Sequence, residues 1–156
     1  MRTNGTNPDT SSIGVRAPKR MLQSVLTALN EGRIAEAVAQ FNDHFTFTDH
    51  ALELEFADKS RLTEFFQKSR ELFPDAVVDV NSSFQCGDHV VAEWKLKATM
   101  QTPPSGATRL QFPISLRGTS IVRVENGRIT DWSDYYDQNR SWRFNLAATF
   151  KEWNEY

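Results

Sequence analysis

The strongest constraint on the fold is a change in hydrophobic period at about residue 76. Before that point apolar residues recur at helical spacing, and after it they alternate with polar residues, as the two faces of a β-strand require. The alternation is clearest along 90–98, whose apolar side is formed by Val90, Ala92, Trp94, Leu96 and Ala98. Helices followed by long two-faced strands predict an α+β domain, in which helices cover one face of a strongly curved, mostly antiparallel sheet.

Three helices are predicted ahead of the sheet. The first ends at Gly32, and its apolar residues recur at i, i+3, i+4 and i+7: Leu22, Val25, Leu26 and Leu29. A second, shorter helix repeats the pattern with Ile34, Ala37, Val38 and Phe41. The third begins near Asp58 or Ser60, either of which can cap it, and Pro74 ends it. Its apolar face is formed by Leu62, Phe65, Phe66, Leu72 and Phe73.

Strands are predicted on both sides of the third helix. Two short alternating stretches precede it, and longer ones follow residue 76; they span 45–49, 52–56, 76–80, 90–98, 110–118, 119–124 and 128–137. Gly118 is interpreted as a bulge that bends the sheet. Asn126 and Gly127 join the last two strands as a hairpin, because both positions of such a turn require positive φ. A final helix is expected to carry Trp142, Leu146, Phe150 and Trp153 on one side.

Length and charge limit the organisation and the partners. A chain of 156 residues supports one domain, which we place at 19–156. Residues 1–18 are rich in Asn, Thr, Ser, Gly and Pro without periodicity, so a disordered leader is expected there. The formal net charge is -2 and the basic residues are dispersed, which argues against nucleic acid as a partner.

The lone cysteine, Cys86, rules out an internal disulfide and a zinc cluster built on thiolates, and a reducing cytoplasm is the expected location. His44, His50 and His89 have no metal-ligand spacing with the nearby aspartates, so neither a metal nor a cofactor is expected. No apolar run approaches the roughly 20 residues of a membrane span, and residues 1–20 lack the apolar core of a signal peptide. No membrane partner is expected.

The last predicted strand carries the most informative residue, Asp134. Alternation places Trp132, Asp134 and Tyr136 on the same side of that strand. An acid between two rings on a core-facing side is costly unless it is paired, protonated or used. Asp134 is therefore either a catalytic acid or base with a raised pKa, or a buried acid held by backbone N–H groups or by an arginine, for which the candidates are Arg117, Arg123 and Arg128.

Three stretches resemble a known superfamily: 32–38 leading into 45–49, 104–106 ahead of the long strand, and 127–137. Over about residues 20–150 the chain resembles the nuclear transport factor 2-like superfamily, a cone-shaped domain shared by ketosteroid isomerases, limonene epoxide hydrolases and SnoaL-like polyketide cyclases. This resemblance implies a concave sheet that encloses a cavity. Together with the broad outer face of such a sheet, it implies a homodimer.

The resemblance also implies roles for two acids. Asp134 matches the aspartate that epoxide hydrolases of this fold use as an acid or base and that lies in cyclase-like pockets. Asp49 matches the position of the general base of ketosteroid isomerases. The isomerase oxyanion donors fall on Val25 and Ser120, so that oxyanion hole is absent. His50, beside Asp49, could orient it or shuttle a proton, or lie exposed at the strand end.

The epoxide hydrolase machinery is also incomplete in this sequence. Its Arg-x-Asp pair falls on Trp94 and Leu96, and its Tyr-x-Asn falls on Phe47 and Asp49. The sequence keeps two carboxylates in an apolar cone, which is closer to the cyclases with a single aspartate. If both acids enter the cavity, mutual repulsion should leave one of them protonated, which would pair an acid with a base.

The expected cavity would take a small, mostly apolar, ring-containing molecule. Its predicted lining residues are Phe47, Leu72, Val78, Trp94, Leu96, Phe112, Ile114, Leu116, Trp132 and Tyr136. The first functional hypothesis is acid/base catalysis without a cofactor, of isomerase or cyclase type, with Asp134 as the principal group and Asp49 as an auxiliary one. The second is a binding module without catalysis for a small ligand, and the third is epoxide hydrolysis.

Overall fold

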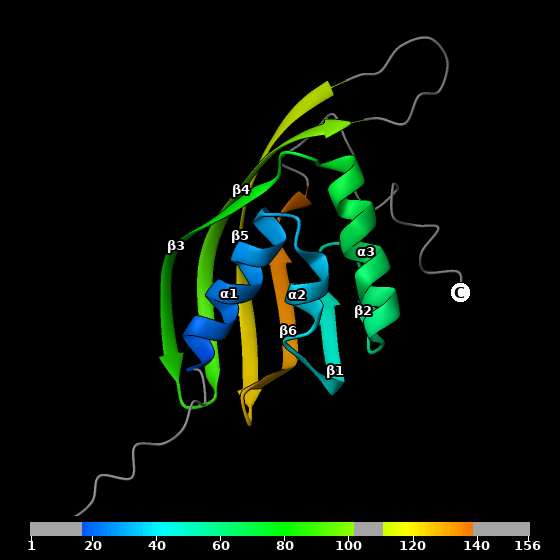
Figure 1. Cartoon of the computed structure of the whole chain (residues 1–156). Coiled ribbons are helices and arrows are strands. Elements are labelled where there is room, and N and C mark those ends of the chain that lie inside the picture. Colours follow the sequence, from blue (N-terminus) through cyan, green and yellow to red (C-terminus); the bar gives the residue numbers. More distant parts are fainter. Residues whose placement is uncertain (1–16, 102–110, 139–156) are drawn as a thin grey trace, which may run out of the picture.

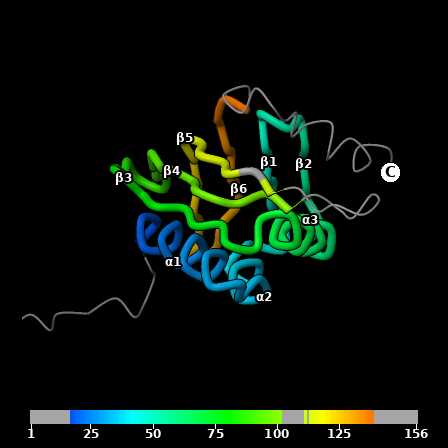
Figure 2. Tube along the Cα trace, turned by 90° about the horizontal axis from the view of Figure 1, so that it is seen from above, coloured from blue at the N-terminus to red at the C-terminus, as the bar shows by residue number. Residues whose placement is uncertain are grey.

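The computed structural model describes residues 17–101 and 111–138, which form three helices on one six-stranded sheet. The helices are α1 (Pro18–Asn30), α2 (Ile34–Val38) and α3 (Lys59–Leu72). All three lie on the same side of the sheet, with α1 over β3 and β4 and α3 beside β1 and β2 (Figure 1, Figure 2). The fold is the predicted α+β cone. No helix in this part of the chain is long and apolar enough to cross a membrane.

The sheet has the strand order β2-β1-β6-β5-β4-β3. The strands are β1 (Phe41–Asp49), β2 (Leu54–Phe56), β3 (Val77–Cys86), β4 (His89–Gln101), β5 (Gln111–Glu125) and β6 (Arg128–Tyr136). Every neighbouring pair is antiparallel except β1 and β6, which run parallel. This parallel pair places the first strand in the sequence beside the last described one, and so brings Asp49 next to Asp134.

Local signals explain where most of the elements begin and end. The Asp58 carboxylate accepts a hydrogen bond from the backbone N–H of Arg61 at 3.0 Å, so Asp58 is the N-cap of α3. Asn126 and Gly127 have φ of 49° and 71°, which is the expected hairpin turn between β5 and β6. The alternation along β4 is also as predicted, because Val90, Ala92, Trp94 and Ala98 are buried and Leu96 is partly buried.

Two local predictions were wrong. Phe41 does not continue the second helix; it is fully buried as the first residue of β1, where it pairs with Ile129. Gly118 is not a bulge, because the β4–β5 register runs through it without a shift. The register shift in the β5–β6 pair lies between Arg123 and Val124, where β6 has the extra residue Thr130. A β-carbon added at Gly118 would overlap the Trp94 indole, so glycine is required there by the close approach of that ring.

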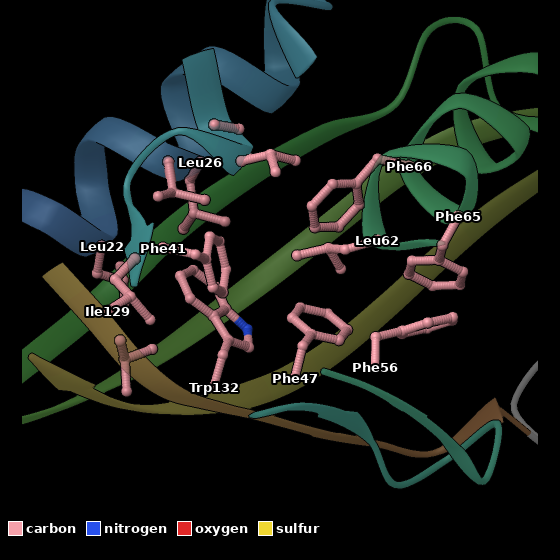
Figure 3. Close-up of a cluster of buried hydrophobic side chains, with 14 of the residues drawn as sticks. Leu22, Leu26, Phe41, Phe47, Phe56, Leu62, Phe65, Phe66, Ile129 and Trp132 are labelled. Atoms are coloured by element: carbon pink, nitrogen blue, oxygen red, sulfur yellow. The ribbon is translucent and has the colours of Figure 1, made fainter. Parts of the chain in front are cut away.

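Aromatic rings from the sheet and from α3 form the centre of the core (Figure 3). Phe47 is in edge-to-face contact with Phe66 at 5.6 Å between ring centroids, and it stacks on Trp132 at 6.3 Å. Phe56 and Phe65 pack beside them at 5.0 Å. The abundant aromatic residues therefore fill the core, and some of them also line the cavity described below.

Three predicted segments lie wholly or mainly outside the described residues. They are the leader at 1–18, the loop at 103–106 and the final helix expected near Trp142. Of the leader, only Ala17 and Pro18 are described.

Candidate active site

Three polar side chains form one row across the inner face of the sheet. Asp49 on β1 pairs with Asp134 on β6, and Asp134 pairs with Ser120 on β5. Residues opposite one another on neighbouring strands share a face and lie roughly 5 Å apart, so this register brings the two acids and the hydroxyl together. On β6 this row is flanked by two aromatic residues of the same face, Trp132 on one side and Tyr136 on the other.

The Asp134 carboxyl accepts both of its hydrogen bonds on one oxygen. Ser120 Oγ donates to Oδ1 at 2.5 Å, and the indole N–H of Trp132 donates to the same atom at 2.7 Å. Among the described residues none donates to Oδ2. Because Oδ1 already accepts from two donors, the proton of the neutral acid belongs on Oδ2. Asp134 is also one of the residues that line the cavity.

Ser120 is itself held by Trp94. The indole N–H of Trp94 donates to Ser120 Oγ at 2.8 Å, which leaves the hydroxyl proton for Asp134. The result is a chain of donors that runs from Trp94 through Ser120 to Asp134 across three adjacent strands. Trp94 is only 6% exposed and Ser120 only 1%, so these bonds are shielded from bulk solvent.

An arginine partner for Asp134 was the alternative to a functional acid. Within the described residues neither Arg117, Arg123 nor Arg128 forms an ion pair with Asp134. Arg123 pairs instead with Asp88 at 2.9 Å, and Arg128 donates to a backbone carbonyl. The donors to Asp134 are therefore neutral and cannot offset the loss of hydration of its charged form.

Burial raises the pKa of Asp134 to about 7, and the neighbouring charge of Asp49 acts in the same direction. The hydrogen bonds from Ser120 and Trp132 oppose this shift, because they favour the carboxylate. An acid with a pKa near neutrality holds its proton or releases it with a small change in pH, which suits both general acid and general base chemistry.

Asp49 is more fully enclosed, with 5% of its surface exposed. Its Oδ1 accepts from the backbone N–H of Leu52 at 2.9 Å, and its Oδ2 accepts from the Tyr136 hydroxyl at 2.9 Å. Burial raises the pKa of Asp49, and these hydrogen bonds oppose the shift. Burial and the Asp49 charge also raise the pKa of Tyr136, so its hydroxyl stays neutral and remains a donor.

A cavity of about 180 Å³ separates this row from the helices, and most of its lining is apolar. Of the residues predicted to line it, eight do so: Phe47, Val78, Trp94, Leu96, Ile114, Leu116, Trp132 and Tyr136. Leu72, in the last turn of α3, is buried in the core but does not line the cavity. The side chain of Phe112 lies outside the described residues.

The sequence prediction did not assign several lining residues to the cavity. They come from α1, from α3, from the residues just after β1 and α3, and from β5. They are Leu26, Leu29, Leu52, Phe65, Phe66, Ser69, Phe73 and Ser120. Helical periodicity identified the inner faces of α1 and α3, but it does not tell which part of each face meets the cavity and which part meets other side chains.

His50 does not join the acid row. It is exposed, its ring stacks on Tyr135 of β6 at 4.2 Å between ring centroids, and its backbone N–H donates to the Asp134 carbonyl at 3.0 Å. His44 and His89 are exposed as well. Across 17–101 and 111–138 the side chains of His, Cys, Asp and Glu form no group of three placed to hold a metal ion.

The curved sheet, the covering helices and the enclosed acid row define a cone-shaped domain of the nuclear transport factor 2-like superfamily. The model of the SnoaL-like domain family matches residues 22–132, so this chain belongs to that family. None of the curated proteins matches the chain.

Solved structures similar to this one share its fold at low sequence identity. A proposed SnoaL-like polyketide cyclase from Shewanella denitrificans is 16% identical with a TM-score of 0.71, covering 84% of this chain and 97% of that one. IdmH, a proposed polyketide cyclase from Streptomyces antibioticus, is 18% identical with a TM-score of 0.68, covering 78% and 93%. A Catenulispora acidiphila protein of ketosteroid isomerase-like fold, solved with trimethylamine, is 17% identical with a TM-score of 0.68, covering 80% and 89%.

Proposed function

We propose that this protein catalyses proton transfer on a small, apolar, ring-containing molecule without a cofactor, as an isomerase or cyclase does. The observation that supports this most is the Asp134 carboxyl, which lines an apolar cavity, has neutral hydrogen-bond donors and a pKa raised to about 7, and has one oxygen to which no described residue donates. A structural ion pair would have the opposite properties, with a charged partner and a lowered pKa.

The proposed chemistry uses Asp134 in both protonation states. As a carboxylate, Oδ2 takes a proton from a ring carbon next to a carbonyl, and the bonding electrons move onto the carbonyl oxygen to form an enolate. The protonated Asp134 then returns the proton at another carbon, which isomerises the ligand. Alternatively the enolate carbon attacks a second carbonyl and closes a ring, and the alkoxide formed takes the proton from Asp134. The Tyr136 hydroxyl donates its single proton to Asp49, so it could stabilise the negative oxygen only if that proton turned from Asp49 to the ligand.

A second candidate is a binding module that takes the same molecule without acting on it. The observation in its favour is that both Asp49 oxygens already accept hydrogen bonds, so this acid serves the interior of the protein rather than a ligand. Epoxide hydrolysis has less support, because Phe47, Trp94 and Leu96 give the cavity an apolar surface where a hydrolase of this fold would hold its water.

A model carbon acid tests the proposal without knowledge of the natural substrate. The probe 5-nitrobenzisoxazole is a small apolar bicycle that opens to a coloured phenolate when a base removes its ring proton. We expect turnover above the buffer rate, rising with pH and levelling above about pH 7, because the carboxylate form of Asp134 is the base. Asp134→Asn should lower the rate at least about 100-fold.

Asp131→Asn is the matched control, because Asp131 lies on the same strand and is exposed to solvent. This variant should keep the wild-type rate. If the probe binds but the wild type and Asp134→Asn convert it equally, the protein is a binding module and the catalytic proposal is wrong.

A further inference from the structure

A second, smaller cavity adjoins the first at the C-terminal end of α1. Its volume is about 140 Å³, and it shares six lining residues with the cavity of Asp134: Leu29, Phe66, Ser69, Phe73, Val78 and Leu96. Its other lining residues are Asn30, Ile34, Arg70 and Ala76. The two cavities are therefore neighbouring compartments of one interior, with both acids in the first and a single basic side chain, Arg70, in the second.

Arg70 is partly buried in the last turn of α3 and has donors to spare. Its Nη1 donates to the Asn30 carbonyl at 3.1 Å and, more weakly, to the Leu29 carbonyl at 3.5 Å. The Asn30 carbonyl lies at the end of α1, whereas the Leu29 carbonyl also accepts from the backbone N–H of Gly32 at 3.1 Å. Nε and Nη2 donate to no described residue, so three of the five N–H groups of the guanidinium remain available.

No carboxylate among the described residues forms an ion pair with Arg70. The acid whose pKa it influences is Asp75, but Asp75 is exposed and accepts from the backbone N–H of Thr99 at 2.6 Å. Gly32 lies under the free edge of the guanidinium, where an added β-carbon would lie 3.7 Å from both Nε and Nη2. Because Gly32 has no side chain, no β-carbon packs on that edge.

We propose that the second cavity is an anion subsite, in which Arg70 binds the carboxylate of a ligand whose apolar ring occupies the cavity of Asp134. This inference rests on the proposed function, since it names the substrate class of the same site. The fork of N–H groups on a guanidinium matches a carboxylate, and partial burial strengthens the bonds. Because Asp49 and Asp134 repel an anion, the ligand has one favourable orientation, with its carboxylate toward Arg70 and its ring toward Asp134.

Two probes of equal size test the charge preference directly. 2-Naphthoate and 2-naphthamide share a ring system and differ in the charge of one group. At about pH 6, where Asp134 is mostly protonated, calorimetry should show that the wild type binds the naphthoate roughly tenfold more tightly than the amide. Arg70→Gln should remove the preference, and Lys68→Gln, an exposed position on the same helix, should keep it.

A measurement on the wild type makes the test independent of how well Arg70→Gln folds. The side-chain Nε–H resonance of Arg70, assigned with Arg70→Lys, should shift when 2-naphthoate is added and should stay in place with 2-naphthamide. The inference is wrong if the wild type binds both probes equally, if Arg70→Gln retains the preference, or if the resonance does not respond. None of these results depends on proton transfer, so the subsite can fail while turnover of 5-nitrobenzisoxazole by Asp134 still holds.

Discussion

At the scale of single residues, alternation predicted the right face for Trp94, Trp132, Asp134 and Tyr136, because each step along a strand reverses the side chain. The sequence did not predict that Ser120 connects Trp94 to Asp134. That connection depends on the registers of β4 with β5 and of β5 with β6, which are set by pairing between distant segments rather than by any local pattern.

Ser120→Ala should change both the acidity of Asp134 and the stability of the fold. The lost hydrogen bond favours the carboxylate, so its removal should raise the pKa of Asp134 further above about 7. The indole N–H of Trp94 would also lose its acceptor, at a cost of about 1–3 kcal/mol. Carboxyl carbon resonances followed by NMR over a pH titration, together with urea unfolding, measure the two effects.

Ser133→Ala is the control for this experiment, since Ser133 is adjacent to Asp134 on β6 but points to the other face of the sheet. An Asp134 pKa that stays level or falls in Ser120→Ala would show that the hydroxyl does not donate to the carboxyl.

At the scale of elements, strong local signals located α1, α3 and the β5–β6 hairpin, because a cap, a stop or a positive φ acts within a few residues. The interpretation of Gly118 as a bulge was wrong because the role of this glycine depends on a residue far away in the sequence. A glycine in a strand indicates a bulge or a close approach, and only the position of Trp94 on the neighbouring strand decides between them.

The contact between β4 and β5 at Gly118 can be measured with a double-mutant cycle. Gly118→Ala should destabilise the protein by about 1–3 kcal/mol, because its β-carbon would overlap the Trp94 indole. Trp94→Ala should cost about 3–5 kcal/mol, since the indole is buried. In the Trp94→Ala background, Gly118→Ala should cost clearly less, although its β-carbon would still lie 2.8 Å from the Tyr135 carbonyl oxygen. An equal cost in both backgrounds would show that the indole does not require glycine there.

At the scale of the whole molecule, the order of helices and strands was enough to predict the architecture, whereas the extent of the cavity was not, because it depends on how α1 and α3 lie over the sheet (Figure 2). The outer face of the sheet carries exposed apolar side chains: Phe84 at 64%, Tyr135 at 45% and Ile121 at 39%. Phe84 and Ile121 both lie opposite Val91, so they form a row across three strands.

We expect this row to be the centre of a homodimer interface. Light scattering at micromolar concentration should give twice the mass of the chain for the wild type and the mass of one chain for Ile121→Glu, because a charge cannot be buried there without a partner. Lys97→Gln, at an exposed charged position on β4, should remain dimeric. A monomeric wild type would contradict the prediction.

Asp134 is a partly buried acid with a raised pKa, and no described residue is a positively charged partner for it. Between the ordinary aspartate pKa of 3.8 and about 7, the native state keeps a proton that the unfolded state releases, so Asp134 lowers the stability of the wild type progressively as pH rises through this window. The penalty is absent below the window and constant above it. Asn has no proton to lose, and its side-chain oxygen can still accept from Ser120 and Trp132.

The most direct measurement is urea unfolding of the wild type and Asp134→Asn at about pH 4 and about pH 8. We expect nearly equal stability at the lower pH and a variant that is more stable at the higher pH, by up to about 4 kcal/mol for the shift from 3.8 to about 7. A variant that is clearly less stable than the wild type at both pH values would contradict the raised pKa of Asp134, because it would show that the Asp134 carboxylate stabilises the native state.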